Sequence, residues 1–370
     1  MSPKDRGVPM LHNRTAGSHR TTERSGLTLL EVLVTIVVLI LLMALILPGL
    51  NGTRVNSRRA ECLNNMRWVA IAFQTYATAN NGDLPMLHQA DLENDADPGN
   101  TPHRAGWPFE LLPYLEEQGL YDRLTTVDAA TNSDPNNADT FHSLTSNINL
   151  RVYTCPDSDK DEQGGALSFV VNMGYMTADI WDDPGQTYRH QVSGTYDWNN
   201  GDFAADSFED EQLSRASGAV LFDHEGVPTS LNRIPDGVSS TILLTENLDA
   251  GSWISGVPHD IGFAVRIDGT TAAIPTAEDG GIGSDTQQTA LQLPAHDAFD
   301  LGPSAINSDL NRKRRYRPRP SSVHPSVVNV FFLDGHGRSL SESIDPLVFA
   351  KLVTSGGEKY GQEALDDSSF

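Results

Sequence analysis

A long apolar run opens the informative part of the chain. From Leu27 to Leu47, 21 residues are interrupted only by two threonines and by Glu31. At a rise of about 1.5 Å per residue, a helix of that length roughly matches the hydrocarbon layer of a membrane. The run therefore predicts a single membrane-crossing helix within residues 27–50, with one carboxylate near its start.

The pattern becomes amphipathic after Pro48-Gly49. Apolar residues then recur close to every 3.6 positions until Asn81-Gly82, a typical stop signal with Pro85 beyond it. We expect the helix to kink or loosen at the proline and to continue through residues 51–85, docking one face on a globular domain.

Residues 86–370 carry a different pattern. Short apolar or alternating segments are separated by Gly, Pro, Asn and Asp, as in "ALSFVVNMGYM", "SGAVLFD", "SSTILLTEN" and "VVNVFFLDGHGRSL". They predict an α+β fold in which the long N-terminal helix precedes a mainly antiparallel β domain. Long polar connections, such as residues 180–213 and 267–320, predict long loops.

Charge is distributed unevenly along the chain. Residues 1–26 carry a balance of +3, so the total of −23 leaves the remainder near −26. Basic residues before an apolar helix favour a cytoplasmic N-terminus, and the domain after the helix is then expected outside the cytoplasm. The acidic remainder disfavours general binding to nucleic acid.

The residues around the start of the apolar run carry a family resemblance. The segment Gly26-Leu27-Thr28-Leu29-Leu30-Glu31 resembles the leader of type IV prepilins and type II secretion pseudopilins. The resemblance implies that prepilin peptidase removes residues 1–26, that Leu27 becomes the methylated N-terminus, and that Glu31 pairs with the amine of a neighbouring subunit. It also implies an inner-membrane location and a homo- or hetero-polymer of pseudopilins. Leu27 departs from the usual Phe.

Two alternatives concern this N-terminal region. A secretory signal peptide fits less well, since its apolar core is about half as long and its cleavage site follows that core. Glu31 has an alternative as an interfacial side chain that snorkels to water. An unpaired carboxylate inside a membrane helix costs roughly 2.5 kcal/mol or more, which favours a pairing partner.

Five segments resemble successive blocks of a bacterial family of pseudopilin-like proteins of unknown function. They are "RRAECLNNMRWVAIAFQTYATANNGDLP", "GWPFELLPYLEEQGLYDRL", "YTCPDSD", "GVSSTILLTEN" and "SSVHPSVVNVFFLDGHGRSL". The last contains the family's signature of a histidine, nine residues and Asp-Gly, here His324 and Asp334-Gly335. Because the family has no established reaction, the resemblance implies an architecture and a location only.

The signature itself does not predict a joint site. Ten residues of extended strand cover about 33 Å, so His324 and Asp334 are too far apart to share a ligand without a sharp bend. Asp334-Gly335 instead predicts a hairpin with a type I′ turn. We expect His324 to tie down a neighbouring loop, with a metal or ligand role as the alternative.

Two further patterns bear on metal or covalent chemistry. Asp157, Asp159 and Asp161 alternate as in calcium loops, but the turn glycine and final bidentate acid of an EF-hand are missing, so a solvated turn is the default and a looser calcium site the alternative. Cys62 and Cys155 would pair in an oxidising compartment, closing a loop of about 90 residues worth about 4 kcal/mol. Free thiols are the other outcome.

The remaining features leave two classes of function. Six basic residues from Arg312 to Arg319 favour charge pairing within or between subunits over polyanion binding. No motif specific enough to name a catalyst occurs, so we expect no enzyme and no required cofactor. The first class is a pseudopilin-like structural subunit. The second is a membrane-tethered module that binds carbohydrate, peptide or ion. Four tryptophans in polar segments would suit stacking against a sugar, although such residues are more typical of a core or of loop anchoring: Trp107, Trp181, Trp198 and Trp253.

Overall fold

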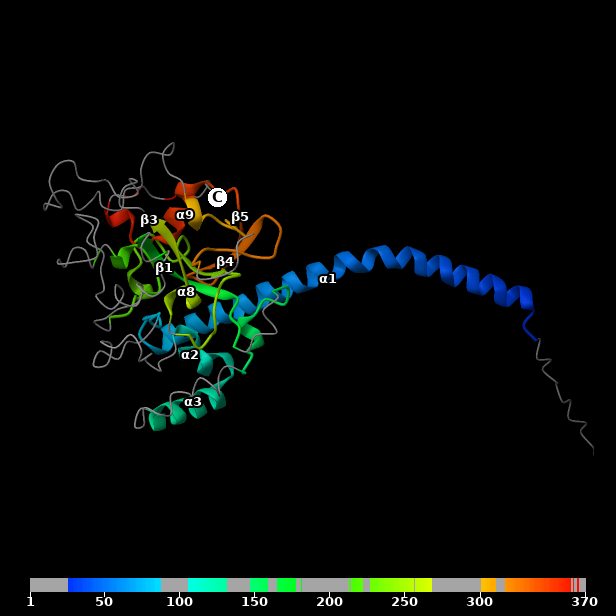
Figure 1. The fold of residues 1–370 in the computed structure, drawn as a ribbon, viewed down its shortest axis with the longest axis horizontal. Helices are drawn as coiled ribbons and strands as arrows, with labels where there is room; N and C mark the ends of the chain where they lie inside the picture. Colours follow the sequence, from blue (N-terminus) through cyan, green and yellow to red (C-terminus); the bar gives the residue numbers. More distant parts are fainter. Residues whose placement is uncertain are drawn as a thin grey trace, which may run out of the picture. The chain divides into compact units, whose positions relative to one another are not determined.

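The computed structural model divides the chain into two units, Met1–Arg54 and Val55–Phe370 (Figure 1). It describes residues 26–87, 106–131, 147–158, 165–177, 181, 212, 214–221, 227–255, 257–267, 301–310, 317–360, 362 and 365. Two of the three candidate calcium residues, Asp159 and Asp161, lie outside the described residues, as do Trp198 and residues 1–25.

Helix α1 spans Leu29–Ala79 and belongs to both units. Its helical assignment continues through Pro48 and Gly49, so the expected kink or loosening does not end the helix. The predicted stop is confirmed: Asn81 adopts a left-handed φ of 59° and the Gly82 N–H donates to the Ala77 carbonyl at 2.7 Å, as in a Schellman motif.

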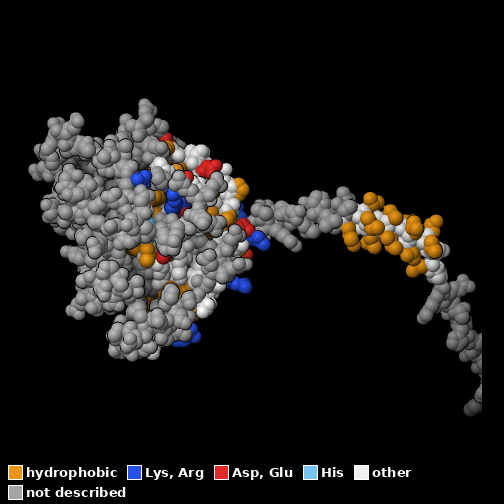
Figure 2. Space-filling view, viewed as in Figure 1, with side chains coloured by type: hydrophobic (Ala, Val, Ile, Leu, Met, Phe, Trp, Pro, Cys, Tyr) orange, Lys and Arg blue, Asp and Glu red, His pale blue; other side chains and the backbone are white. Residues whose placement is uncertain are grey.

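In the first unit, the described apolar side chains of α1 are exposed, as Figure 2 shows over the helix. They include Leu29 at 84% and Met43 at 61%. Measured over the described residues alone, no helix is both long and apolar enough to cross a membrane.

The second unit is a mixed α/β fold around a five-stranded sheet. The strands are β1 (Phe169–Thr177), β2 (Ile242–Glu246), β3 (Gly262–Ile267), β4 (Val327–Phe332) and β5 (Gly337–Ser341), in the spatial order β3-β1-β2-β4-β5. Three neighbouring pairs are antiparallel, whereas β1 and β3 run parallel, so the sheet is mixed. The sequence pattern did not predict β3.

Helices cover both faces of this sheet. Glu246 of β2 lies opposite Phe169 of β1, and its carboxylate contacts Cys62 of α1. Asn172, three residues further along β1, points to the other face and donates to the Val353 carbonyl of α9 (Pro346–Val353). Alternation of side chains along a strand therefore places α1 and α9 on opposite faces.

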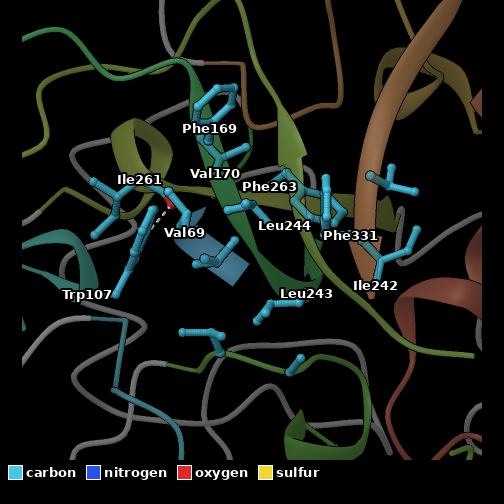
Figure 3. Close-up of a cluster of buried hydrophobic side chains, with 14 of the residues drawn as sticks. Val69, Trp107, Phe169, Val170, Ile242, Leu243, Leu244, Ile261, Phe263 and Phe331 are labelled. Carbon is cyan, nitrogen blue, oxygen red and sulfur yellow. Dashed lines mark hydrogen bonds between the residues drawn. The ribbon is translucent and has the colours of Figure 1, made fainter. Parts of the chain in front are cut away.

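The hydrophobic core extends over both faces of the sheet and includes Val69, Phe169, Leu244 and Phe263 (Figure 3). Trp107 is fully buried beside it and donates its indole N–H to the Ile261 carbonyl at 2.8 Å. The apolar stripe that predicted the second half of α1 is the face that enters this core. Burying such side chains is the main source of stability for the unit.

Shorter elements surround the sheet. The α-helices are α2 (Trp107–Glu110), α3 (Gln118–Thr131) and α8 (Pro258–Ile261); the 3-10 turns are η1 (Leu112–Leu115), η3 (Arg151–Tyr153), η5 (Leu231–Arg233), η8 (Gly302–Ser304) and η9 (Glu358–Tyr360). The segment "SGAVLFD", expected as a strand, is irregular over its described residues 217–221. Two of its N–H groups, those of Ala219 and Val220, both donate to the Asn172 carbonyl.

The predicted hairpin forms, but its turn is of a different type. Gly335 has a positive φ of 86°, whereas Asp334 does not, so a type I′ turn is wrong. The Gly335 N–H donates to the Phe332 carbonyl, and the Phe332 N–H donates to the His336 carbonyl. This arrangement fits a type I turn followed by a glycine bulge, which needs only one left-handed residue.

The two edge strands of the sheet are protected in different ways. At β3, the Ala264 N–H donates to the Pro318 carbonyl and the Arg266 N–H to the Ser304 hydroxyl, so neighbouring segments occupy that edge. β5 is five residues long and polar, with every side chain exposed except that of Leu340.

Candidate functional site

The N-terminal segment forms a capped helix start. The Thr28 N–H and hydroxyl both donate to the Glu31 carboxylate, at 3.2 and 3.3 Å, and the Glu31 N–H donates to the Thr28 hydroxyl at 3.3 Å. This is the reciprocal pattern of a capping box. Gly26 and Leu27 precede the helix and are exposed. That Glu31 caps the helix was not foreseen from the sequence.

A buried cluster of four side chains lies in the second unit. Cys62, Cys155, Glu246 and His324 each direct one potential ligand atom inward, and these four atoms lie within 4.8 Å of one another. All four residues are at most 4% exposed. They come from α1, from the segment after η3, from the end of β2 and from the segment before β4.

Glu246 lies at the centre of the polar contacts. Its Oε1 is 2.9 Å from the Cys62 sulfur, which donates to it, and 3.2 Å from Nε2 of His324. Its Oε2 accepts the N–H of Asn329 on the neighbouring strand at 2.8 Å. The Cys155 sulfur lies 4.0 Å from the same Nε2 of His324. Oε1 is thus fixed toward the sulfurs and the imidazole.

Local structure explains how the loop residues reach the cluster. Asn65 of α1 donates to the carbonyls of Arg151 and Thr154, at 3.0 Å each, which holds the segment bearing Cys155 against the helix. The Ser322 hydroxyl accepts the His324 N–H and donates to the Val327 carbonyl, which fixes the backbone around His324. Both loop residues are therefore positioned by side-chain-to-backbone hydrogen bonds.

The contacts shift the ionisation of the cluster. The hydrogen bond with Cys62, followed by that with His324, lowers the pKa of Cys155 to about 6, although burial opposes this. The hydrogen bond with Cys155 and burial raise the pKa of Cys62. Hydrogen bonds with Cys155 and Glu246 raise the pKa of His324 to about 10. Cys155 is therefore the thiol that most readily becomes a thiolate.

A pocket of about 340 Å³ adjoins the cluster at His324. Its walls include Arg319 and Asp249, whose side chains are 2% and 3% exposed and form an ion pair at 2.5 Å. The second carboxylate oxygen of Asp249, Oδ1, has no hydrogen-bond partner among the described residues. Arg319 also donates from Nε to the Ser308 carbonyl at 2.6 Å.

The structure brings the two cysteines together, as the disulfide hypothesis requires, but as free thiols. His324 joins them, whereas Asp334 lies in the hairpin turn and contacts His336 at 2.6 Å. The expectation that His324 and Asp334 do not form a joint site is confirmed, since each has different partners.

Other candidate residues serve packing or charge pairing. Asp157 forms an ion pair with Arg58 at 3.3 Å. In the basic segment, Arg317 pairs with Asp309 and Arg319 with Asp249, which confirms intramolecular pairing for these two arginines. The tryptophans expected in the core, where described, are buried: Trp107, Trp181 and Trp253.

Sequence reasoning missed Glu246. Its only signal was an acid at the end of the apolar run "ILLTE", where alternation assigns it to the same face as Ile242 and Leu244. An acid on a buried strand face normally needs a specific partner. That signal would have marked Glu246 as a candidate, but not its neighbours.

Fold and site together define a mixed α/β domain built on the second half of a long helix, with a buried Cys₂-Glu-His cluster at the helix–sheet contact. The chain belongs to the family described as "Protein of unknown function (DUF1559)", which matches residues 53–347. No curated protein and no solved structure matches the chain.

Within this chain, the cluster draws on the segments that carried the bacterial family resemblance. Four of the five segments supply one member each: the helical segment supplies Cys62, "YTCPDSD" supplies Cys155, "GVSSTILLTEN" supplies Glu246, and the last segment supplies His324. His324 is thus a member of the buried cluster, whereas Asp334-Gly335, which follows after nine intervening residues, forms the hairpin turn.

Proposed function

We propose that the chain is a pseudopilin-like structural subunit with no catalytic role. In this proposal prepilin peptidase cuts after Gly26, Leu27 is methylated, and the apolar segment anchors the subunit in the inner membrane with the second unit outside the cytoplasm. Copies, or related pseudopilins, associate through this segment in a type II secretion or type IV pilus-like system.

The observation that carries the proposal is the apolar surface of α1. The large apolar side chains of α1 from Leu29 to Met43 are between 43% and 84% exposed, and Figure 2 shows apolar side chains along this part of the helix. The apolar sequence runs on to Leu47. A helix that is apolar on every side needs lipid or other helices around it.

The capping box sharpens the test of Glu31. Gln serves as well as Glu at this position of a capping box, so Glu31→Gln preserves the helix start while it removes the charge. If Glu31 neutralises a neighbour's amine in the membrane, Glu31→Gln abolishes assembly, since the neighbour's ammonium then stays unpaired at a cost of roughly 2.5 kcal/mol or more. Thr28→Ala, which removes the cap but keeps the charge, is the matched control and retains assembly.

Assembly is measured by chemical crosslinking between subunits in native membranes, together with the mature N-terminus by mass spectrometry. The proposal requires a chain that begins at methylated Leu27. If the Glu31→Gln variant crosslinks as well as the wild type while the Thr28→Ala variant does not crosslink, the role of Glu31 is only to cap the helix. A mature chain that begins beyond Leu47 would refute the processing route.

A second candidate function is supported by the pocket beside His324. Its volume of about 340 Å³ lies within the range of small-molecule sites, and it offers a buried arginine and an unpartnered carboxylate oxygen of Asp249. These groups suit a small polar ligand, such as a carbohydrate, on a membrane-tethered binding module. A glycan array that finds a tight ligand, lost in an Arg319→Met chain that is still folded, with Glu31 dispensable, would favour this function.

A further inference from the structure

The donor atoms of the buried cluster have the spacing of a tetrahedral metal site. Zinc bonds of about 2.3 Å to sulfur and about 2.0 Å to nitrogen or oxygen give ligand-to-ligand edges of about 3.3 to 3.8 Å. The three contacts described above measure 2.9, 3.2 and 4.0 Å. All four atoms lie within 4.8 Å of one another, so shifts of a few tenths of an ångström per side chain suffice.

The directions of the contacts argue against a catalytic cysteine–histidine–acid triad. In such a triad the acid holds one ring nitrogen of the histidine while the thiol faces the other. Here the Glu246 carboxylate and the Cys155 sulfur both face Nε2 of His324, and the Cys62 sulfur meets the same carboxylate oxygen. The groups converge on one point instead of forming a relay.

Burial gives a second, independent reason for a cation. Glu246 and His324 have side chains 3% exposed, and the two cysteines are buried with them. A carboxylate in such a place is unfavourable without strong compensation. The Asn329 N–H satisfies Oε2 and leaves Oε1 directed at the sulfurs and the imidazole, as a ligand oxygen held by its surroundings is in metal sites.

We propose that Cys62, Cys155, Glu246 and His324 bind one Zn²⁺ ion. Two thiolates, an imidazole and a carboxylate are zinc ligands, whereas calcium takes oxygen ligands only, so the calcium alternative does not apply to this cluster. Each thiol gives up its proton when it binds, and the ion replaces those protons without a redox step.

The role of the ion follows from the ligand count. Four protein ligands close the coordination sphere and leave no position for substrate, which defines a structural zinc site. The ligands come from α1, the segment after η3, the end of β2 and the segment before β4, so the ion joins the helix to the sheet and to two loops. All four lie in the second unit, and the proposal is independent of the N-terminal segment.

The first test measures metal content on the full chain, purified in detergent under reducing conditions and supplied with zinc. We expect one zinc per chain by elemental analysis. Replacement of zinc by Co²⁺ is expected to give the sulfur-to-cobalt charge-transfer band and intense visible bands of a tetrahedral thiolate site. Substoichiometric zinc in folded protein with both thiols reduced overturns the proposal, whatever the behaviour of the variants.

Variants assign the ligands. Cys155→Ser and Glu246→Gln should each weaken zinc binding by at least about tenfold. Tenfold is the lower end of the loss seen when a residue that only supports a metal ligand is replaced, and loss of a ligand itself should cost no less. Glu246→Gln keeps an oxygen to accept the Asn329 N–H, so it removes charge with the least damage to folding. The control is Asp157→Asn, which removes the nearby ion pair to Arg58 and should retain zinc.

Two further outcomes decide against the site. Loss of zinc in Asp157→Asn, with full retention in Glu246→Gln, would place the metal elsewhere. Non-reducing mass spectrometry of protein from native envelopes is expected to show Cys62 and Cys155 unlinked. A disulfide between them would replace the metal site, because sulfurs that are bonded to each other supply no thiolate.

Discussion

The buried pair of Arg319 and Asp249 allows a stringent test of the structure. Both side chains are almost inaccessible, and the guanidinium donates to Oδ2 of Asp249 and to the Ser308 carbonyl. Arg319→Met removes both contacts and leaves a buried carboxylate whose Oδ1 already has no partner among the described residues. Breaking one side of a buried pair costs about 3–5 kcal/mol, so the free energy of unfolding should fall by that amount.

Arg317 supplies a matched control two residues away. Its pair with Asp309 is as well formed, at 2.8 Å, but the two side chains are 23% and 44% exposed. The same change, Arg317→Met, should cost only about 0–1 kcal/mol because water and salt screen the pair.

The assay is urea unfolding of the full chain in detergent, followed by tryptophan fluorescence. The double variant Arg319→Met with Asp249→Leu should recover most of the lost stability, since it removes the uncompensated charge as well. Equal losses for Arg319→Met and Arg317→Met, or a double variant no more stable than Arg319→Met, would refute the assignment of a buried charge pair.

Three smaller effects follow from local geometry and are measured by the same unfolding assay. Gly335→Ala should cost about 1–2 kcal/mol, because φ is +86° at this turn; no loss would mean that the turn rearranges freely. Asp345→Ala should cost about 0.5–2 kcal/mol, since its carboxylate accepts the Leu347 and Val348 N–H groups at the start of α9; Asp345→Asn, which keeps a cap, should be nearly neutral. Trp107→Phe should lower the free energy of unfolding by about 1–3 kcal/mol, because it removes the N–H that donates to the Ile261 carbonyl; a smaller loss would argue against that hydrogen bond.

The local elements of the fold were largely predictable from the sequence. The recurrence of apolar residues about every 3.6 positions predicted the second half of α1, and the predicted stop at Asn81-Gly82 lies within three residues of the helix end at Ala79. Alternation located β1, β2 and the β4–β5 hairpin, since these signals depend on neighbours in the chain. The turn type was wrong because Asp-Gly suits both a type I′ turn and a glycine bulge, and flanking hydrogen bonds decide between them.

The assembly of distant segments was not predictable. Nothing in the spacing of Cys62 and Cys155 showed that Glu246 and His324 lie beside them in space, because that depends on the strand order and on the register of β2 against β1 and β4. The parallel pairing of β3 with β1 is likewise non-local. The sequence offered three separate traces of the cluster, namely the possible pairing of the two cysteines, the metal or ligand alternative for His324 and the acid that ends a buried strand, but nothing that joined them.

The protection of the sheet edges affects how copies of this domain behave when they are densely packed. One edge has its backbone donors occupied by the Pro318 carbonyl and the Ser304 hydroxyl, and the other is a short polar strand that carries Arg338. Unoccupied edges of long apolar strands invite amyloid-like growth when many identical chains are concentrated together. Copies of this domain held side by side at high density would therefore resist fusing their sheets, and contacts between them would stay reversible.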